Sequence, residues 1–220
     1  RAHKHRAQLV ALQSQMNPHL MYTMLATISV MAEMGQSAAI PAIVDDLSEM
    51  MRYIASSEDS VHTLGSEFAF VRRYLQSMKH RFRDDLDVTV DCPPELEELA
   101  VPRLILQPFI ENAVKHTTRC RPPWCLAVRA GCDAGRWWVT IEDNGPGFGD
   151  DQLVDLEAEF VRLRTLNPGL ADLPDLHVEG MGLINTFVRL RLSYGERAVM
   201  ELGNRPDGGA SIRIGGSIDD

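Results

Sequence analysis

The segment Asp143-Asn-Gly-Pro-Gly147 combines an acidic side chain with two glycines, and it directly follows a predicted β-strand over residues 137–142. A carboxylate at the end of a strand can accept a hydrogen bond from an exocyclic amine such as that of adenine. Gly145 and Gly147 have no side chain, so the backbone can approach a ligand closely there. The same residue types are typical of tight turns. Taken alone, the segment therefore favours a turn over a nucleotide site.

A second glycine-rich segment, Gly180-Met-Gly182, opens a predicted helix that begins at Leu183. Free backbone N–H groups at the start of a helix, together with the positive end of the helix dipole, make a phosphate site. The alternative is a simple glycine-rich entry into the helix, and it is favoured for this segment in isolation. The sequence contains no Walker A pattern, which excludes a P-loop enzyme.

Three polar residues share one face of a predicted helix over residues 102–116. Lys115 and His116 follow Asn112 by three and four positions. An amide oxygen such as that of Asn112 can ligate Mg²⁺, which keeps several waters and bridges phosphates, and Lys115 can neutralise a phosphate. The alternative is an amphipathic helix with its polar face in water. Glu111 is adjacent but points away from this face, so it carries less weight.

These three segments together resemble the ATP-binding domain shared by histidine kinases, gyrase, MutL and one class of heat-shock chaperone. The matching order is Glu-Asn-Ala-Val-Lys-His, then Asp-Asn-Gly-Pro-Gly, then Gly-Met-Gly-Leu. The resemblance implies that ATP binds, that Asn112 holds Mg²⁺ and that Asp143 holds adenine. It implies the same site for Gly145, Gly147, Gly180 and Gly182. We add Lys115, His116 and Leu183 to the predicted nucleotide site.

Residues 148–179 separate the second motif from the third. A structureless loop longer than about 12–15 residues is usually functional or disordered. This one contains a predicted helix over residues 150–165, followed by Asn167-Pro-Gly-Leu-Ala-Asp-Leu-Pro174. We expect a mobile cover over ATP, and a decorative insertion is the alternative.

The N-terminal segment Gln15-Met-Asn-Pro-His-Leu-Met-Tyr-Thr-Met-Leu25 resembles the matching segment of LytS/YehU-type sensor histidine kinases. The resemblance continues through residues 47–53, 74–82 and 104–116, so it covers nearly the whole chain. It implies that His19 accepts the γ-phosphoryl of ATP, with Mg²⁺ and Lys115 neutralising charge. The phosphoryl would then pass to an Asp of a response regulator receiver domain. The alternative is a structural role, which is usual for a lone histidine on an apolar helix.

Three positions depart from the pattern of that family. Leu20 replaces a phenylalanine, which is a mild change. Thr23 stands where asparagine is usual, at an offset from the phosphoacceptor that is linked to dephosphorylation of the partner. Ala210 follows Gly209 where a Gly-Thr pair usually helps to hold adenine, so the missing hydroxyl implies weaker nucleotide binding.

Two apolar stripes predict a pair of helices within residues 1–60. The first stripe recurs in steps of three and four from Leu9 to Met31, with a kink expected at Pro18. The second runs from Ile43 to Ile54, after a turn over residues 35–41. Two amphipathic helices cannot bury both stripes well alone, so we expect a homodimer in which two copies complete a four-helix bundle. The alternative is that both helices pack on the C-terminal domain.

The polar residues 56–60 mark the expected domain boundary. We predict that residues 1–60 serve dimerisation and histidine phosphotransfer, and that residues 61–220 form a catalytic α/β sandwich; the fold class is therefore α+β. The expected helices cover residues 66–83, 102–116, 150–165 and 183–193, and the expected strands cover residues 86–91, 126–130, 137–142, 200–202 and 210–214.

The net charge of −9 argues against nucleic acid as the main partner, because phosphate backbones attract clustered lysine and arginine. The basic run over residues 1–6 could face a membrane, although a solvated helix end is favoured. No stretch reaches the ~18 apolar residues of a membrane span, and no signal peptide opens the chain. The chain begins within a helical pattern, so we expect a missing upstream region that attaches it, as a cytoplasmic domain, to an inner or plasma membrane. The four cysteines lack paired spacing, which fits a reducing cytosol.

Two other classes of function remain open. One is an ATPase that drives conformational change, as in gyrase or MutL, and ATP hydrolysis without a phosphoprotein would favour it. The other is an ATP-binding scaffold that signals by dimerisation without catalysis. Ala210 supports the scaffold, and nucleotide binding without phosphotransfer would favour it.

Overall fold

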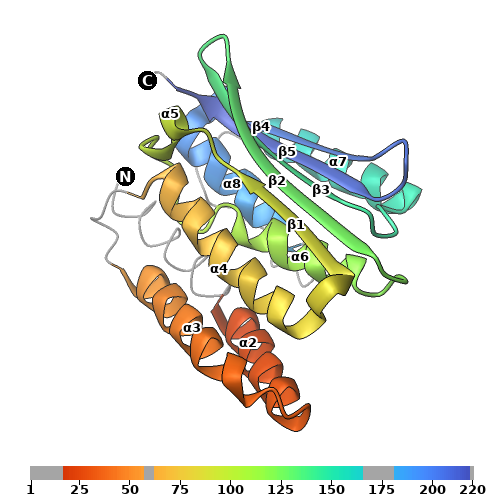
Figure 1. Ribbon diagram of the computed structural model, residues 1–220. Helices are drawn as coiled ribbons and strands as arrows, with labels where there is room; N and C mark the ends of the chain where they lie inside the picture. The colour runs from red at the N-terminus through yellow and green to blue at the C-terminus, as the bar shows by residue number, and fades with distance from the viewer. Residues whose placement is uncertain (1–16, 57–61, 166–180, 219–220) are drawn as a thin grey trace.

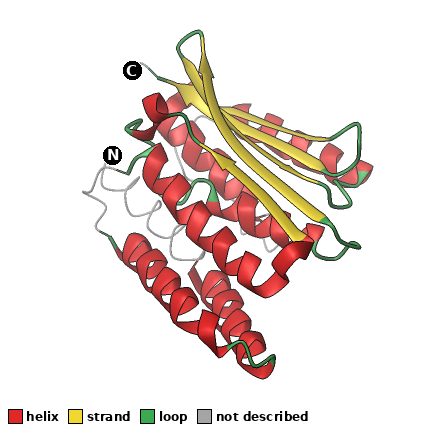
Figure 2. Cartoon of the chain, viewed as in Figure 1, coloured by secondary structure: helices red, strands yellow, loops and turns green. Residues whose placement is uncertain are grey.

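The computed structural model describes residues 17–56, 62–165 and 181–218, which form a helical hairpin and an α/β sandwich (Figures 1 and 2). The expected α+β architecture is confirmed. Residues 1–16 lie outside the described ranges and Pro18 belongs to the first turn of the first described helix, so the kink expected there stays a prediction. None of the helices in the described ranges is long and apolar enough to cross a membrane.

The hairpin consists of α2 (Asn17–Glu33) and α3 (Ile40–Ala55), separated by the short 3₁₀ helix η1 (Ser37–Ala39). Gly35 has a φ of 70° in the turn after α2, a conformation that glycine adopts without strain. Pro41 lies in the first turn of α3, where a missing N–H leaves no helical bond unmade. The predicted turn and helix start are therefore confirmed.

A third helix, α4 (Leu64–Phe82), covers the hairpin on the side that faces the sheet (Figure 1). The apolar residues of the hairpin that are buried are Leu20, Met24, Met31, Ile43, Met50 and Ile54. The alternative, in which both helices pack on the C-terminal domain, is therefore found in part, because α4 covers the two stripes within one chain. Exposed apolar side chains remain at Met21, Tyr22, Leu25, Met34 and Val44. Dimerisation through the hairpin stays a prediction.

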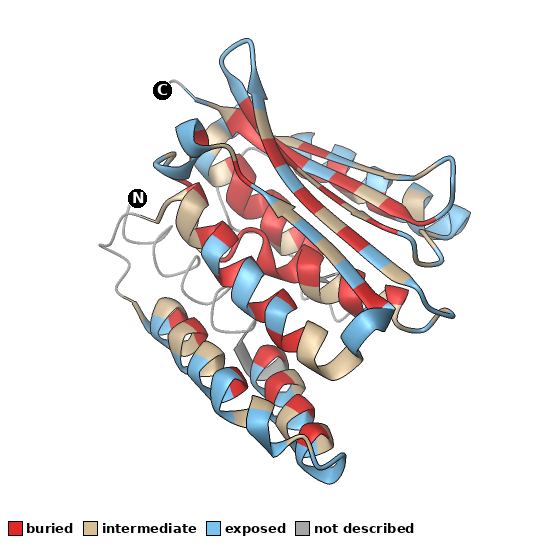
Figure 3. Cartoon of the chain, viewed as in Figure 1, coloured by how far each residue is buried: buried red, intermediate tan, exposed pale blue. Residues whose placement is uncertain are grey.

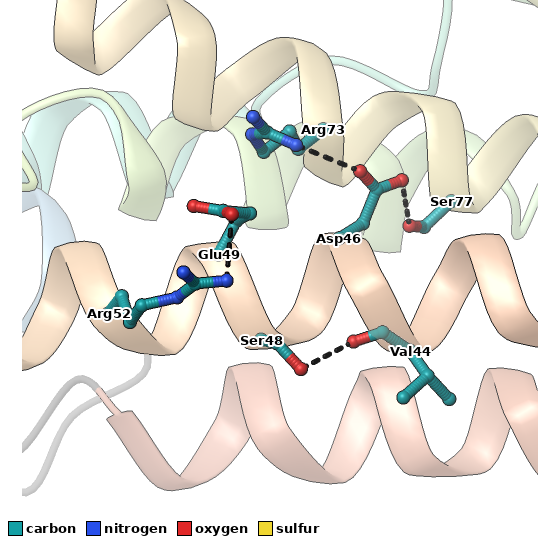
Figure 4. A network of polar contacts seen from close by, with 7 residues as sticks. All are labelled: Val44, Asp46, Ser48, Glu49, Arg52, Arg73 and Ser77. Atoms are coloured by element: carbon teal, nitrogen blue, oxygen red, sulfur yellow. Dashed lines mark hydrogen bonds and ion pairs between the residues drawn. The ribbon is translucent and has the colours of Figure 1, made fainter.

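Polar contacts also tie α3 to α4 (Figure 4). The carboxylate of Asp46 accepts hydrogen bonds from Arg73 and from the buried hydroxyl of Ser77, both at 3.4 Å. Thr63 caps α4, because its hydroxyl accepts from the N–H of Ser66 while the Ser66 hydroxyl accepts from the N–H of Thr63. α4 therefore begins two residues before the predicted start.

The sandwich has a five-stranded sheet in the order β1-β2-β3-β5-β4. The strands are β1 (Leu86–Asp91), β2 (Trp124–Asp133), β3 (Arg136–Asp143), β4 (Val199–Asn204) and β5 (Ala210–Ser217); β1 and β2 are parallel and the other pairs antiparallel. Buried and exposed residues alternate along the strands (Figure 3), because successive side chains point to opposite faces. All five predicted strands are confirmed, and most extend a few residues further.

The helices of the sandwich cover one face of the sheet (Figure 1). They are α4, α6 (Gln107–Thr117), α7 (Asp150–Thr165) and α8 (Met181–Tyr194). Short helical turns are η2 (Arg83–Asp85), α5 (Pro94–Glu97) and η3 (Gly195–Arg197). The predicted helices over residues 150–165 and 183–193 are confirmed, and α5 was not expected.

The helix predicted over residues 102–116 begins only at Gln107, so its first turn is a correction. Leu104 has a φ of 57°, outside the helical region. The carboxylate of Glu67 accepts hydrogen bonds from the backbone N–H groups of residues 104, 105 and 106. These groups bond to a distant side chain and not to a helical partner, so the chain turns into α6 abruptly.

Candidate functional site

An open cavity of about 150 Å³ lies among α6, the end of β3, α7 and the start of α8. Its lining residues are Phe109, Asn112, Ala113, Lys115, His116, Asp143, Pro146, Gly147, Phe148, Gln152, Leu183, Ala210 and Ile212. The three predicted motifs therefore meet at one place. Gly180 lies outside the described residues. Glu111 does not line the cavity, as expected, and accepts a hydrogen bond of 2.6 Å from Gln107.

Asp143 presents a carboxylate that is only 6% exposed at the end of β3. Its Oδ1 accepts hydrogen bonds from the N–H of Gly145 at 2.8 Å and of Ala210 at 3.3 Å. Both of these bonds use Oδ1, which leaves Oδ2 to accept from a ligand. A Cβ on Gly145 would lie 2.9 Å from Oδ1, so the glycine allows the backbone to wrap the carboxylate.

Two long-range contacts hold the loop after Asp143, and sequence reasoning missed both. The Asn204 side chain at the end of β4 accepts from the N–H of Phe148 at 2.7 Å and donates to its carbonyl at 2.8 Å. A Cβ on Gly147, whose φ is 73°, would lie 2.6 Å from the same side chain. Arg205 donates to the Asp143 carbonyl at 3.2 Å. Nothing in the local sequence pattern marks Asn204 as part of the site.

Asn144 points away from the cavity and fastens the loop to β2. Its Oδ1 accepts from the N–H of Cys125 at 2.7 Å, and its amide group donates to the Pro123 carbonyl at 2.9 Å. In Asp143-Asn-Gly-Pro-Gly147, the aspartate therefore faces the cavity while the asparagine anchors the turn. The turn interpretation of this segment is confirmed, and its role in holding a ligand stays a prediction.

The polar face of α6 supplies the remaining groups. Asn112 and His116 are half-buried in the wall of the cavity, and Lys115 is exposed at its rim. The described residues contain no group of three His, Cys, Asp or Glu side chains that could hold a metal ion. Mg²⁺ suits a site with one protein oxygen, because it usually keeps several waters and bonds to phosphates. The position of the Asn112 amide fits that mode of binding.

Gly182 allows close packing between α6 and α8, the two helices beside the cavity. A Cβ on Gly182 would lie 3.2 Å from the Cβ of Pro108 at the start of α6. The first turn of α8 therefore lies directly against the first turn of α6. Leu183 is buried and lines the cavity.

His19 lies in the first turn of α2, and its side chain is outside the described residues. The hairpin lies on one side of α4, and α6, whose residues line the cavity, lies on the other side (Figure 1). Thr23, one turn after His19, is half-buried, and its carbonyl accepts a hydrogen bond of 2.9 Å from the Thr27 hydroxyl. The phosphoacceptor role of His19 stays a prediction.

Two buried charged residues were also missed. Glu67 of α4 and Arg189 of α8 are each 1% exposed. Burial raises the pKa of Glu67, an effect opposed by its hydrogen bonds and by Arg189, and burial lowers the pKa of Arg189. The signal that could have found Glu67 is its position, because it shares the apolar face of α4 with Leu64 and Phe68.

Comparison with known families gives two matches. The model of the histidine kinase family matches residues 7–86, and that of the histidine kinase-, DNA gyrase B-, and HSP90-like ATPases matches residues 98–215, more than half of the chain. The first match extends through α4, past residues 56–60, and the domain boundary expected there stays a prediction.

Individual relatives agree with the family models. The sensor histidine kinase YesM of Bacillus subtilis is 29% identical over 208 residues, which cover 94% of this chain and 33% of that protein. The sensor protein kinase HptS of Staphylococcus aureus is 25% identical over 205 residues, 93% of this chain and 37% of that protein. The chain thus spans about a third of the length of these relatives.

Among solved structures, the histidine kinase domain of the blue-light activated histidine kinase EL346 of Erythrobacter litoralis matches with a TM-score of 0.46 and 18% identity, covering 96% of this chain and 91% of that one. The family assignment rests on the two sequence models and the cavity their motifs form. The chain belongs to the sensor histidine kinases, and its C-terminal domain to the histidine kinase-, DNA gyrase B- and HSP90-like ATPases.

Proposed function

We propose that the chain transfers the γ-phosphoryl group of ATP to a ring nitrogen of His19 and then to an Asp of a response regulator receiver domain. The observation that carries the proposal is the cavity lined by a buried carboxylate, Asp143, by the amide of Asn112 and by the cation of Lys115. A site that binds adenine at one end and phosphates at the other needs these groups.

Each group has one role in the proposed reaction. Asp143 Oδ2 accepts from the exocyclic amine of adenine, and Gly145 and Gly147 let the loop close around the base. Asn112 holds Mg²⁺, which neutralises phosphate charge when bound. Lys115 adds a positive charge at the rim, and the start of α8 at Gly182 offers backbone N–H groups to the phosphates.

His19 acts as the nucleophile in this proposal. An imidazole of ordinary pKa, about 6.5, is largely neutral at pH 7, so it needs little activation. A bond forms between the ring nitrogen and the γ-phosphorus, the bond to the bridging oxygen breaks, and ADP leaves. The protein contributes mainly positioning and charge neutralisation.

The partners and location belong to the same proposal. The exposed apolar side chains at Met21, Tyr22, Leu25, Met34 and Val44 support a homodimer through the hairpin. The proposed location is the cytoplasmic side of a membrane, as part of a longer sensor kinase; the chain spans about a third of the length of its relatives.

Labelled ATP tests the proposal. Wild-type protein should take up label that is lost in acid and kept in base, as a phosphoramidate is. The variant His19→Gln removes the nucleophilic nitrogen but keeps a similar size and an amide, so it should bind ATP like wild type and take up no label. His116→Gln is the control, because His116 lines the cavity. Label that survives His19→Gln and disappears with His116→Gln would refute the assignment of His19.

A further inference from the structure

A buried junction joins the helical hairpin to the loop that precedes α6. We define the junction as Tyr53 of α3, Glu67 of α4, Arg189 of α8 and the loop Arg103–Leu106. At its centre, Glu67 accepts a hydrogen bond of 2.5 Å from the Tyr53 hydroxyl at Oε1. The carboxylate also accepts from backbone N–H groups at 2.5 Å (Leu104), 2.8 Å (Ile105) and 3.0 Å (Leu106).

Four donors surround the two oxygens of this one carboxylate. An ionised carboxylate can only accept hydrogen bonds, so the ionised form of Glu67 fits this geometry. Removing a single partner from such a network leaves a buried charge less well satisfied. The Tyr53 hydroxyl is the only one of the four that belongs to the hairpin.

Further contacts fix the loop from its other sides. Arg189 donates to the carbonyl of Leu104 at 3.2 Å and also to the carbonyl of Arg103. The side chain of Arg103 donates to the carbonyl of Ser56, the residue that follows α3, at 2.6 Å. Leu104 keeps a φ of 57°, which a leucine adopts only where surrounding contacts impose it. Contacts from the hairpin, from α4 and from α8 therefore all fix the position of the loop over residues 103–106.

The loop runs directly into α6 and is bonded to α8 through Arg189, and both helices line the nucleotide cavity. The residue after Leu106 begins α6, which carries Asn112 and Lys115. Arg189 lies two turns after Gly182 on α8, whose start lines the same cavity. A shift of the hairpin that moved Tyr53 or Ser56 would pull on this loop and so on the groups that hold the nucleotide.

We propose that Tyr53 and Arg103 are positioning residues, which align the helices of the hairpin with the helix that carries the nucleotide-binding groups. The proposal rests on the proposed phosphorylation of His19, because alignment matters only if the two parts react. A misplacement of ~1 Å can lower a rate about 100-fold while binding is retained.

The variant Tyr53→Phe removes one hydroxyl and leaves Glu67 with its three backbone donors. We expect the rate of His19 phosphorylation at saturating ATP to fall at least about tenfold, while ATP affinity stays within about twofold of wild type. Tyr74→Phe is the control, because Tyr74 is a buried tyrosine of the neighbouring helix α4 and no hydrogen bond of its hydroxyl is found among the described residues. Its rate and affinity should both match wild type.

A second variant tests the same proposal independently, in case Tyr53→Phe folds poorly. Arg103→Met removes the bond to Ser56 but keeps the carbonyl that Arg189 contacts, and it should show the same separation of rate from affinity. A phosphorylation rate near or above that of wild type in both variants would overturn the proposal. A parallel loss of rate and affinity would do so too, because it would indicate damage to the nucleotide site.

Amide hydrogen exchange tests the junction without phosphorylation. A non-hydrolysable ATP analogue with Mg²⁺ should slow exchange in the last turn of α3, residues 52–55, in wild type and in Tyr74→Phe but not in Tyr53→Phe. If wild type binds the analogue without this slowing, the junction proposal fails even where His19 is phosphorylated. If the slowing occurs but His19 takes up no label, the proposed function fails and the junction stands.

Discussion

Replacing Asp143 by asparagine separates the two tasks that this carboxylate performs. In the structure, Oδ1 accepts from the N–H groups of Gly145 and Ala210. The amide of the Asp143→Asn variant would keep an oxygen for those two bonds and place an NH₂ group where Oδ2 now lies. That group is a donor, so it would face the donor amine of adenine. The loop of this variant should therefore keep its shape while the contact with adenine is lost.

The size of the effect follows from the kind of bond removed. A hydrogen bond to a charged group contributes ~1.5–3 kcal/mol, so ATP should bind about 10- to 150-fold more weakly to Asp143→Asn. Asp143→Ala also leaves the Gly145 and Ala210 N–H groups without their acceptor. Each unsatisfied buried donor costs roughly 1–3 kcal/mol, so only the alanine variant should also lose stability.

Isothermal titration with ATP and thermal unfolding check both statements. Glu142→Gln is the control, because Glu142 is the preceding residue of β3 and its side chain pairs with Arg129 at 3.3 Å, away from the cavity. Its ATP affinity should match that of wild type. Wild-type affinity in Asp143→Asn would refute the adenine assignment. Equal melting temperatures for the alanine and asparagine variants would refute the structural role of Oδ1.

Two further predictions concern the loop and the dimer. Asn204→Ala removes both bonds to the Phe148 backbone, together worth ~1–3 kcal/mol, and should weaken ATP binding at least about fivefold in the same titration. Unchanged affinity would contradict a role for Asn204 in ordering the loop. The double variant Tyr22→Lys with Leu25→Lys places two charges on the exposed face of α2 and should be a monomer by light scattering at micromolar concentration, whereas wild type and the control Val161→Lys should be dimers. A monomeric wild type would contradict the homodimer.

Local patterns in the sequence were sufficient for most secondary structure and for naming the candidate residues of the cavity. The motif around Asp143 and the polar face at Asn112 and Lys115 could be placed because strand ends and helix faces follow from the spacing of neighbouring residues. Their meeting in one cavity was an expectation from the resemblance, and the fold confirms it for the described residues.

The errors arose where a distant side chain overrode a local pattern. The apolar and polar spacing over residues 102–106 suits a helix, yet Glu67, 37 to 39 positions earlier, binds the N–H groups that would begin it. Asn204 reaches Phe148 across 56 positions of sequence. Partners so far apart leave no periodic signal, because the contact depends on how strands and helices are arranged in space.

The sequence by itself determined where most helices and strands lie, and it supplied the candidate residues for binding ATP and accepting a phosphoryl group, whose roles stay predictions. Only the tertiary structure decided that α4 covers the hairpin and that Glu67, Arg103 and Arg189 join it to the nucleotide helices. Helix and strand patterns reflect interactions within a few residues, whereas burial of a charge depends on which groups the folded chain brings around it.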